Sequence, residues 1–406
     1  MGDNDTVYEG VFAVNKPQDV TSADVIRKLK EHFNPSALFK SCLDLEREAR
    51  SREPKKERRK RRIKQLELKM GHGGTLDPLA SGVLIIGVLR GTKDLPNFLG
   101  ACTKTYEATV LFGAETDTHD CLGKIVRTRG YDHITRDKVE AALDQFRGRF
   151  LQNPPLFSAL KYKGKKLYEY AREGKVPPVQ PEPRPVDVSK LEILQWYNPG
   201  EHEFRWPEQA PKEEREAAEK ILGQADSMPV AASGEGQEPE SVGSESLTKR
   251  KSPPTAEGPA GDTDTPAEQS AAKKQKVTAE GDASQPEKRS VSDTQNAESS
   301  TAPKEADPES LPQPPAVKVR MTVSSGFYVR SLAHDLGRAL DSCGIMTSLV
   351  RTQQGDYTLD PEKVLDYKDL EAGEEVWGPK VKQFLVEWEQ RKAAESNAPG
   401  NGSRPS

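Results

Sequence analysis

The chain contains a long internal segment that cannot form a hydrophobic core. No aromatic residue occurs between Trp206 and Phe327, and from about Ala225 to Pro315 the sequence is mostly Ser, Ala, Glu, Pro, Lys, Thr, Gly and Asp. A segment of this composition buries too little apolar surface to offset the conformational entropy that is lost on folding. The predicted segments are residues 1–205 and 317–390 of one folded domain, a mostly disordered insertion over 206–316, and a disordered tail over 391–406.

The segments on either side of this insertion alternate between strand and helix patterns. Apolar alternation and aliphatic runs predict strands, and apolar stripes at helical spacing predict helices. The order does not form a regular βαβ repeat, so the predicted fold class is α/β (α+β) with a mixed, largely antiparallel sheet. The predicted strands are 11–14, 82–89, 104–112, 190–196, 317–323 and 347–357, and the predicted helices are 21–33, 136–146, 164–174 and 330–340.

Cysteine usage and apolar runs exclude several classes of protein. The four cysteines, at positions 42, 102, 121 and 343, include no CxxC pair, which argues against a disulfide scaffold and a structural zinc site and favours a reducing compartment. No apolar run approaches eighteen residues, so no membrane span is expected. The N-terminus is acidic and polar, which argues against a secretory signal and an arginine-rich presequence.

A strongly basic segment lies within the first half of the domain. Arg50–Lys64 contains ten Lys or Arg residues and two Glu, a net charge of +8 in fifteen residues. Such a bias is typical of a nucleic-acid-binding or nuclear-import segment, whereas a solvated helix face normally mixes both signs. We interpret about 45–69 as a basic insertion. Smaller basic clusters, TKRKSPP and AAKKQK, lie inside the predicted disordered insertion.

A glycine-rich stretch precedes a single carboxylate. In GHGGTLDP, three glycines occur in four residues before Asp77, and an aliphatic strand follows. Such a loop lets the backbone approach a ligand closely and then presents a carboxylate. On spacing alone, a turn-forming role for Asp77 before Pro78 is a better explanation than catalysis. A phosphate-binding loop is excluded because GVLRGTK lacks the required spacing.

Five motifs follow one another in an order known from one protein family. They are VNKPQDVTS (Val14–Ser22), GHGGTLDPLASGVL (Gly71–Leu84), KTYEATVLFGAETDTHDCLGKI (Lys104–Ile125), NPPLFSALKYKGKKLYEYAREG (Asn153–Gly174) and SSGFYVRSLAHDLGRAL (Ser324–Leu340). A shorter element, TSLVRTQQG, comes next. With this set, which covers nearly all of the predicted domain, the chain resembles the TruB-type pseudouridine synthases, which isomerise a uridine in the T-arm loop of tRNA. The resemblance implies the pseudouridine synthase fold.

The resemblance implies a role for eight side chains. Asp77 corresponds to the catalytic carboxylate, Tyr106 to a residue that stacks on the target base, and Arg330 to the partner of the aspartate. The implied substrate-binding residues are His72, which holds the flipped nucleotide, Tyr328, which contacts the base, Leu349, which closes the pocket, Asp120, which joins the arginine's ionic network, and Lys16, which packs with Pro17 beneath the site. The family usually has threonine where this chain has Gly73, a change that leaves the His72–Asp77 spacing intact.

The residue types suit the reaction that the resemblance implies. Pseudouridine formation breaks the N1–C1′ bond, turns the base and rejoins it through C5, and it requires no metal or redox cofactor. It needs an ionised carboxylate, and an aspartate with an ordinary pKa of about 3.9 supplies one, with an arginine to orient it. Attack of Asp77 on C1′, attack on C6 and initial removal of a sugar proton all remain open.

The resemblance also implies a partner. We expect tRNA to be recognised by T-arm shape and phosphate contacts, with uridine 55 flipped into the site. Basic residues beside Tyr162, Tyr168 and Tyr170 suit that role, although an ordinary amphipathic helix explains them as well. The expected protein is a stand-alone monomer, nuclear, with a mitochondrial pool and messenger RNA substrates left open.

Two other functions compete with a stand-alone enzyme. The catalytic subunit of a guide-RNA-directed particle would carry a further RNA-binding module, and only about 45 residues follow Tyr357. A tRNA-folding chaperone would need no catalysis, and the complete set of Asp77, Tyr106 and Arg330 argues against it. His119 and Cys121 lack a second pair of ligands at metal spacing, and His334 is interpreted as a structural histidine.

Overall fold

The structure is a computed structural model, and it describes residues 6–52, 66–155, 161–162, 165–166, 182–212, 215 and 313–397. All of them belong to one compact unit formed by Met1–Glu235 and Leu311–Ser406. Segments that are far apart in the sequence therefore build one unit. Most of the predicted insertion, and residues 53–65 of the basic segment, lie outside the described residues.

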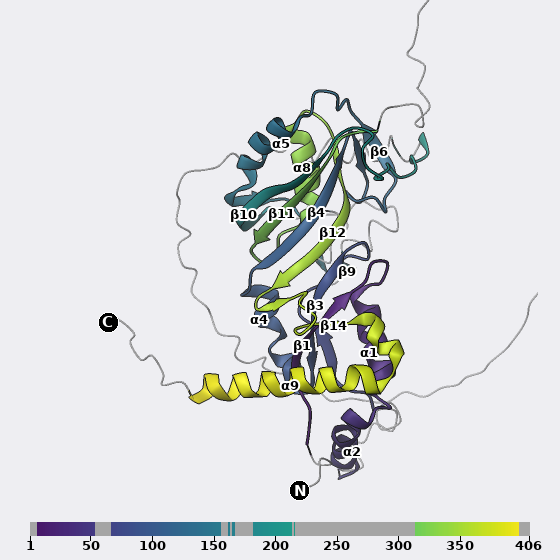
Figure 1. Ribbon diagram of the computed structural model, residues 1–406, viewed down its shortest axis with the longest axis vertical. Coiled ribbons are helices and arrows are strands. Elements are labelled where there is room, and N and C mark those ends of the chain that lie inside the picture. Colours follow the sequence, from purple (N-terminus) through teal and green to yellow (C-terminus); the bar gives the residue numbers. More distant parts are fainter. Residues whose placement is uncertain are drawn as a thin grey trace, which may run out of the picture. The chain divides into compact units, whose positions relative to one another are not determined.

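A ten-stranded sheet forms the centre of this unit (Figure 1). The spatial order of its main path is β14-β1-β3-β12-β4-β11-β10-β7, with β2 beside β3 and β13 beside β12. Only the β1–β14 and β3–β12 pairs are parallel among the described strands of the sheet. The mixed, largely antiparallel sheet confirms the predicted fold class. The strands are β1 (Gly10–Lys16), β2 (Met70–His72), β3 (Ser81–Val88), β4 (Lys104–Phe112), β7 (Gly148–Gln152), β10 (Arg184–Tyr197), β11 (Ala316–Val323), β12 (Gly344–Gln354), β13 (Tyr357–Thr358) and β14 (Leu365–Asp366).

Two small hairpins and the helices complete the described chain. Helix α8 packs on β12 and β4, α5 packs on α8 and β10, and α9 packs on β1 and β14 (Figure 1). The hairpin strands are β5 (Ala114–Thr116), β6 (Ile125–Thr128), β8 (Lys161–Tyr162) and β9 (Lys165–Lys166). The helices are α1 (Ser22–Phe33), α2 (Ala37–Arg52), α4 (Leu95–Gly100), α5 (Arg136–Leu143), α8 (Val329–Ala339) and α9 (Glu374–Asn397), with short 3-10 turns η2 (Leu89–Lys93), η3 (Asp144–Phe146) and η4 (Tyr367–Ala372).

The aliphatic strands form the core because they are covered on both faces. Every residue of β3 except Ser81 is buried, as its continuous apolar run predicts. Helix α8 contributes Leu332 and Leu336 to the same core cluster, and Leu340 follows at the end of the helix. Burial of these side chains is the main favourable contribution to folding. It fixes the face that α8 turns toward β4 and β12, and thereby the direction of the polar side chains on that helix.

The first helix begins where its capping residues predict. The Thr21 side chain accepts a hydrogen bond from the Asp24 amide, and the Asp24 carboxylate accepts one from the Thr21 amide. This reciprocal capping box satisfies two amides that the helix itself leaves unpaired. Of the two predicted N-caps, Thr21 and Ser22, the structure selects Thr21. That choice frees the Ser22 hydroxyl for a contact with the glycine-rich loop.

Several element boundaries differ from the sequence prediction. Helix α2 runs to Arg52 and so extends into the predicted basic insertion at about 45–69. Helix α9 continues to Asn397, so the predicted tail boundary at residue 391 falls within a helix. Lys165–Lys166 form strand β9 where a helix over 164–174 is predicted, and the rest of that helix lies outside the described residues.

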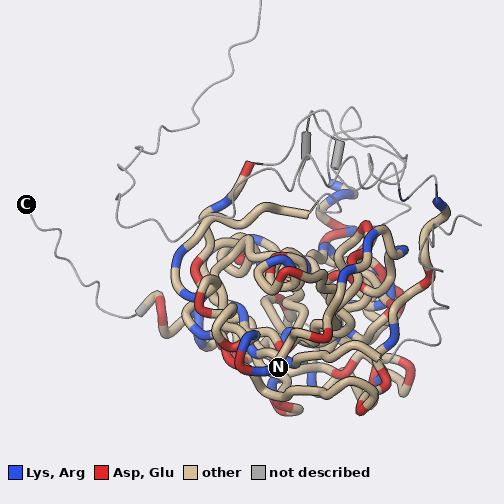
Figure 2. Tube along the Cα trace, turned by 90° about the horizontal axis from the view of Figure 1, so that it is seen from above, with Lys and Arg blue, Asp and Glu red and all other residues tan. Residues whose placement is uncertain are grey.

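The described chain carries both signs of charge throughout (Figure 2). Lysine and arginine residues are interspersed with aspartate and glutamate along the tube, seen from above. Pairs such as Arg90 with Glu9 and Lys380 with Asp369 link neighbouring segments. None of the described helices is both long and apolar enough to span a membrane.

Candidate active site

Asp77 lies in a turn that is fixed from two directions. The Ser22 hydroxyl, at the start of α1, donates to the Leu76 carbonyl at 3.2 Å and accepts from the Leu76 amide at 2.9 Å. The Asp19 amide donates to the Pro78 carbonyl at 2.9 Å. These bonds hold the backbone on both sides of Asp77 while its own side chain stays 35% exposed. The carboxylate is therefore rigidly placed and still accessible to a ligand.

Arg330 pairs with this carboxylate from the first turn of α8. Its Nε lies 2.8 Å from Oδ2 of Asp77, and its Nη2 lies 3.3 Å from Oδ1, so the guanidinium contacts both oxygens. Its Nη1 donates to the Thr118 carbonyl at 3.0 Å. The Arg330 side chain is only 8% exposed. Two hydrogen bonds from one planar, largely buried guanidinium fix the orientation of the aspartate carboxylate.

Asp120 is a second carboxylate near the Nε of the same guanidinium. Its Oδ2 is 3.7 Å from Nε of Arg330, and its Oδ1 accepts from the Thr118 hydroxyl at 2.7 Å and from the Leu122 amide at 3.1 Å. Burial raises the pKa of the Asp120 carboxyl, while the hydrogen bond from Thr118 and the charge of Arg330 act in the opposite direction. The structure thus brings the predicted residues Asp77, Arg330 and Asp120 into one ionic network.

Tyr106 and Leu349 lie on neighbouring strands. Tyr106 pairs with Arg351 across β4 and β12, and Leu349 pairs with Ala108, two residues along β4. This register makes Tyr106 and Leu349 diagonal neighbours in the sheet. Both are buried in the main core cluster, to which Leu76 from the aspartate loop also belongs. An aromatic and an aliphatic side chain thus share an apolar cluster with that loop.

Tyr328 precedes α8 and is held through its backbone. The Tyr328 amide donates a hydrogen bond to Oε1 of Gln152 at 2.8 Å, and the Tyr328 carbonyl accepts one from Nε2 of the same side chain at 3.0 Å. Gln152 ends strand β7. These two hydrogen bonds fix the start of the helix that carries Arg330. They also fix the backbone from which the half-buried Tyr328 side chain projects.

The Lys16 side chain forms a hydrogen bond with the backbone that follows Asp77. It is fully buried, and its Nζ donates to the Pro17 carbonyl at 2.7 Å and to the Pro78 carbonyl at 3.3 Å. Burial lowers the pKa of Lys16 to about 8, and the nearby Asp77 charge opposes that shift. The lysine therefore ties the segment after Asp77 to the end of β1.

His72 lies on β2, opposite Ile86 of β3. Burial, followed by the charge of Arg351, lowers the pKa of this half-buried imidazole. Its Nδ1 is buried and has no hydrogen-bond partner within the described ranges of the chain. A neutral imidazole with a nitrogen still unbonded can accept or donate one hydrogen bond to a ligand.

Arg351 and Gln354 hold the glycine-rich loop, and neither was predicted as a site residue from the sequence. Arg351, which is fully buried, donates from Nε to the Val83 carbonyl at 2.7 Å and from Nη2 to the Gly74 carbonyl at 3.4 Å. Gln354 donates to the Gly73 carbonyl at 2.6 Å. The sequence around these two residues, TSLVRTQQ, is polar and gives no local signal that Arg351 and Gln354 are buried. The contacts themselves depend on the pairing of β3 with β12.

One group of described side chains meets the distance requirement for a metal site. Ligand atoms of Glu115, His119 and His334 lie within 4.8 Å of one another. The two imidazole planes, however, are stacked with an angle of 5° between them and centroids 4.3 Å apart. A metal must lie close to the plane of each imidazole that it binds, and two parallel planes do not meet. Glu115 is also paired with Arg127 at 2.7 Å. This arrangement suits an ion-pair network better than a cation site.

Comparison with known proteins places the chain among RNA-modifying enzymes. Residues 58–209 match a family model described as "TruB family pseudouridylate synthase (N terminal domain)". The chain is 38% identical over 372 residues to "tRNA pseudouridine synthase 4" of Schizosaccharomyces pombe, covering 89% of this chain and 83% of the relative. It is 30% identical over 406 residues to "tRNA pseudouridine synthase 4" of Saccharomyces cerevisiae, covering 97% and 90%.

A solved structure shows a more distant similarity. "Crystal Structure of a Cbf5-Nop10-Gar1 Complex" matches with a TM-score of 0.39 and 18% identity, over 89% of this chain and 53% of that one. At this level the similarity supports nothing beyond the sequence matches.

Proposed function

The chain belongs to the TruB family of pseudouridine synthases, and we propose that it isomerises uridine 55 in the T-arm loop of tRNA without a guide RNA. Family membership makes it a tRNA-modifying isomerase. The position of the target uridine, the independence from guide RNA and the roles of the side chains are the proposal. The observation that carries it is the accessible Asp77 carboxylate, which Arg330 contacts at 2.8 Å and 3.3 Å.

Asp77 is the group that acts on the uridine. In the isomerisation the N1–C1′ bond breaks, the uracil turns, and a C5–C1′ bond forms, while C5 loses a proton and N1 gains one. The net composition does not change. Attack on C1′, attack on C6 and removal of a sugar proton each use the ionised carboxylate. Its two hydrogen bonds from Arg330 fix its orientation toward the reacting nucleotide.

The target nucleotide reaches this carboxylate only after it leaves the folded tRNA loop. Extrusion costs a few kcal/mol, which stacking and apolar contacts must offset. Tyr106 offers an aromatic face, and Leu349 lies diagonally next to it in the sheet. His72 has a buried nitrogen without a described partner, which a flipped nucleotide can engage. These three side chains are proposed to hold the base while it turns.

The deciding experiment measures pseudouridine in an unmodified tRNA transcript incubated with the purified full chain and no guide RNA. We expect conversion at position 55 by the wild type and none by Asp77→Ala. Asp137→Ala is the matched control, because Asp137 is an exposed aspartate in the first turn of α5 and should leave the rate unchanged. Binding of tRNA is measured in parallel and should survive both substitutions.

Three outcomes would overturn parts of this proposal. Tight tRNA binding without conversion by the wild type would favour a folding chaperone or a guide-dependent subunit. Conversion at another uridine would reject position 55 and retain the enzyme. Conversion by Asp77→Ala would reject Asp77 as the acting carboxylate.

A further inference from the structure

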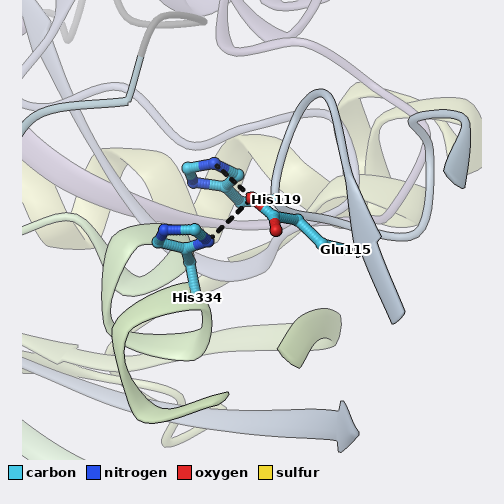
Figure 3. Close-up of side chains that lie close together, drawn as sticks. All are labelled: Glu115, His119 and His334. Atoms are coloured by element: carbon cyan, nitrogen blue, oxygen red, sulfur yellow. Dashed lines mark ion pairs between the residues drawn. The ribbon is translucent and has the colours of Figure 1, made fainter. Parts of the chain in front are cut away.

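Glu115, His119 and His334 form a largely buried cluster of side chains (Figure 3). Nδ1 of His334 is 3.1 Å from Oε1 of Glu115, and Nε2 of His119 is 4.0 Å from the same oxygen. The two imidazole rings stack in parallel at 4.3 Å. The Glu115 and His334 side chains are 2% and 11% exposed. Nothing in the proposed chemistry uses this cluster directly.

The cluster joins the two segments that hold Arg330. His334 follows Arg330 by four residues on α8, so both side chains project from the same face of the helix, one turn apart. His119 lies between Thr118 and Asp120, whose carbonyl and carboxylate are the two groups of this loop that contact Arg330. The stack of His119 on His334 therefore connects the acceptor loop to the helix that carries the arginine.

The backbone at His119 explains how one short loop faces in two directions. Its φ angle is +62°, in the left-handed region that residues with a side chain seldom adopt. The His119 amide donates to the Thr116 carbonyl at 3.2 Å, and its carbonyl accepts from the Met346 amide at 3.1 Å. This conformation turns the imidazole toward His334 while the residues before and after it face Arg330. Surrounding contacts must offset the backbone strain.

The charges within the cluster are complementary. Burial alone would lower the pKa of His334, but its contact with Glu115 outweighs burial and raises it. Burial, followed by the charge of the neighbouring His334, lowers the pKa of His119 to about 3. Burial also opposes ionisation of Glu115, yet the contact with His334 brings its pKa to about 2. The contact between Glu115 and His334 therefore opposes the effect of burial on the pKa of both groups.

We propose that His119 and His334, anchored by Glu115, are positioning residues that hold the Thr118–Asp120 loop against α8 and so align Arg330 with Asp77. The inference depends on the proposed role of the Asp77–Arg330 pair. Neither histidine contacts the substrate. Their effect is transmitted through the two acceptors on the loop, and it should appear in the rate of the chemical step while tRNA affinity is unchanged.

The test is a double-mutant cycle on the full chain with a tRNA transcript. The variants are His119→Asn, His334→Asn and the double variant. Asparagine tolerates the left-handed backbone at position 119, and at position 334 it keeps a donor near Glu115 while it removes the ring. The matched control is His133→Asn, which removes a histidine bonded at 2.7 Å to the Leu340 carbonyl, at the far end of α8. Single-turnover rates, tRNA Kd values and Tm values are measured for each protein.

We expect each single variant to lower the single-turnover rate by about tenfold to hundredfold, with the tRNA Kd unchanged. The double variant should be no slower than the slower single variant, because removal of either ring breaks the same stack. His133→Asn should retain the wild-type rate, and all assays are run well below the lowest Tm. Lys16, Asp77 and Arg330 are unaltered in every protein.

Several results would overturn the inference. Unchanged rates in the single variants, additive losses in the double variant, or a loss confined to Kd would each contradict a positioning role. Loss of wild-type activity in a chelator, restored by zinc, would identify the cluster as a metal site. Failure of the proposed function is separate, because it appears as absence of conversion at uridine 55 by the wild type itself.

Discussion

Position 73 shows how one residue is matched to its surroundings. The family usually has threonine there, and this chain has glycine. A Cβ at Gly73 would lie 2.9 Å from the Phe98 Cβ and 3.3 Å from the Ile85 Cβ, so the packing of α4 against the loop leaves no room for a side chain. The glycine is therefore required by the neighbouring phenylalanine. Its carbonyl is the group that Gln354 binds.

Gly73→Ala should lower the free energy of unfolding by about 1–3 kcal/mol, because the added methyl group overpacks the contact with Phe98. Denaturant unfolding measures the change. Gly100→Ala is the control, since nothing lies within 4 Å of a Cβ at that position. Equal stability of Gly73→Ala and the wild type would show that α4 moves away at little cost.

The pKa of His119 predicts how stability depends on pH. Its pKa is lowered from 6.5 to about 3 by burial, so between these values the unfolded histidine binds a proton and the folded one does not. The free energy of unfolding must therefore fall as the pH drops from about 6.5 toward 3. His119→Asn removes this group, and its stability should fall less steeply over that interval. Denaturant midpoints at several pH values provide the measurement, and parallel curves for the two proteins would contradict the prediction.

Two adjacent residues at the start of helix α1 have different roles: Thr21 is its N-cap, and Ser22 is its first residue. Thr21 closes the capping box, and the Ser22 hydroxyl forms hydrogen bonds with both backbone groups of Leu76, next to Asp77. The helix is thus a rigid support whose start positions Asp77. Its stability and the placement of the carboxylate depend on adjacent side chains.

Thr21→Ala and Ser22→Ala should therefore differ in what they change. Thr21→Ala should cost about 1 kcal/mol of stability through the lost cap and leave the rate of conversion nearly unchanged. Ser22→Ala should lower the rate, because the loop before Asp77 loses its anchor. Thermal unfolding and single-turnover rates are compared for both variants. Equal rates for the two proteins would show that Ser22 does not position the aspartate.

In the molecule as a whole, the charge of one basic segment differs from that of the rest of the chain. The described chain intermixes basic and acidic residues (Figure 2), whereas Arg50–Lys64 carries a net +8 and lies mostly outside the described residues. Phosphate contacts release counterions, so a segment that binds tRNA steepens the salt dependence of affinity. We propose that this segment contributes to tRNA binding and that the protein is nuclear.

Deletion of residues 53–64 should weaken tRNA binding and flatten the plot of log Kd against log salt concentration, with the single-turnover rate at saturating tRNA preserved. Filter binding at several salt concentrations measures the slope. An unchanged slope together with loss of nuclear signal from an internally tagged chain would assign the segment to import. A tagged wild type without nuclear signal would reject the proposed location.

The short strands β2, β7, β13 and β14 were not predicted. The other six strands of the ten-stranded sheet and the order of the family motifs could be predicted from the sequence. Those features depend on local patterns, such as the apolar run of β3 and the capping residues of α1, which short-range physics fixes. Composition predicted a basic insertion and a tail, but it does not show that helices α2 and α9 continue into them.

Only the tertiary structure decided which side chains meet. Arg330 and Asp77 are 253 positions apart in the sequence. They come into contact because β4 pairs with both β11 and β12 in the sheet, and because α8 packs on β4 and β12. The parallel pairing of β12 with β3 brings Arg351 and Gln354 to the glycine loop. The packing of α8 on β12 places His334 against the loop of His119. No local pattern encodes such contacts, since they arise when distant segments bury a common core.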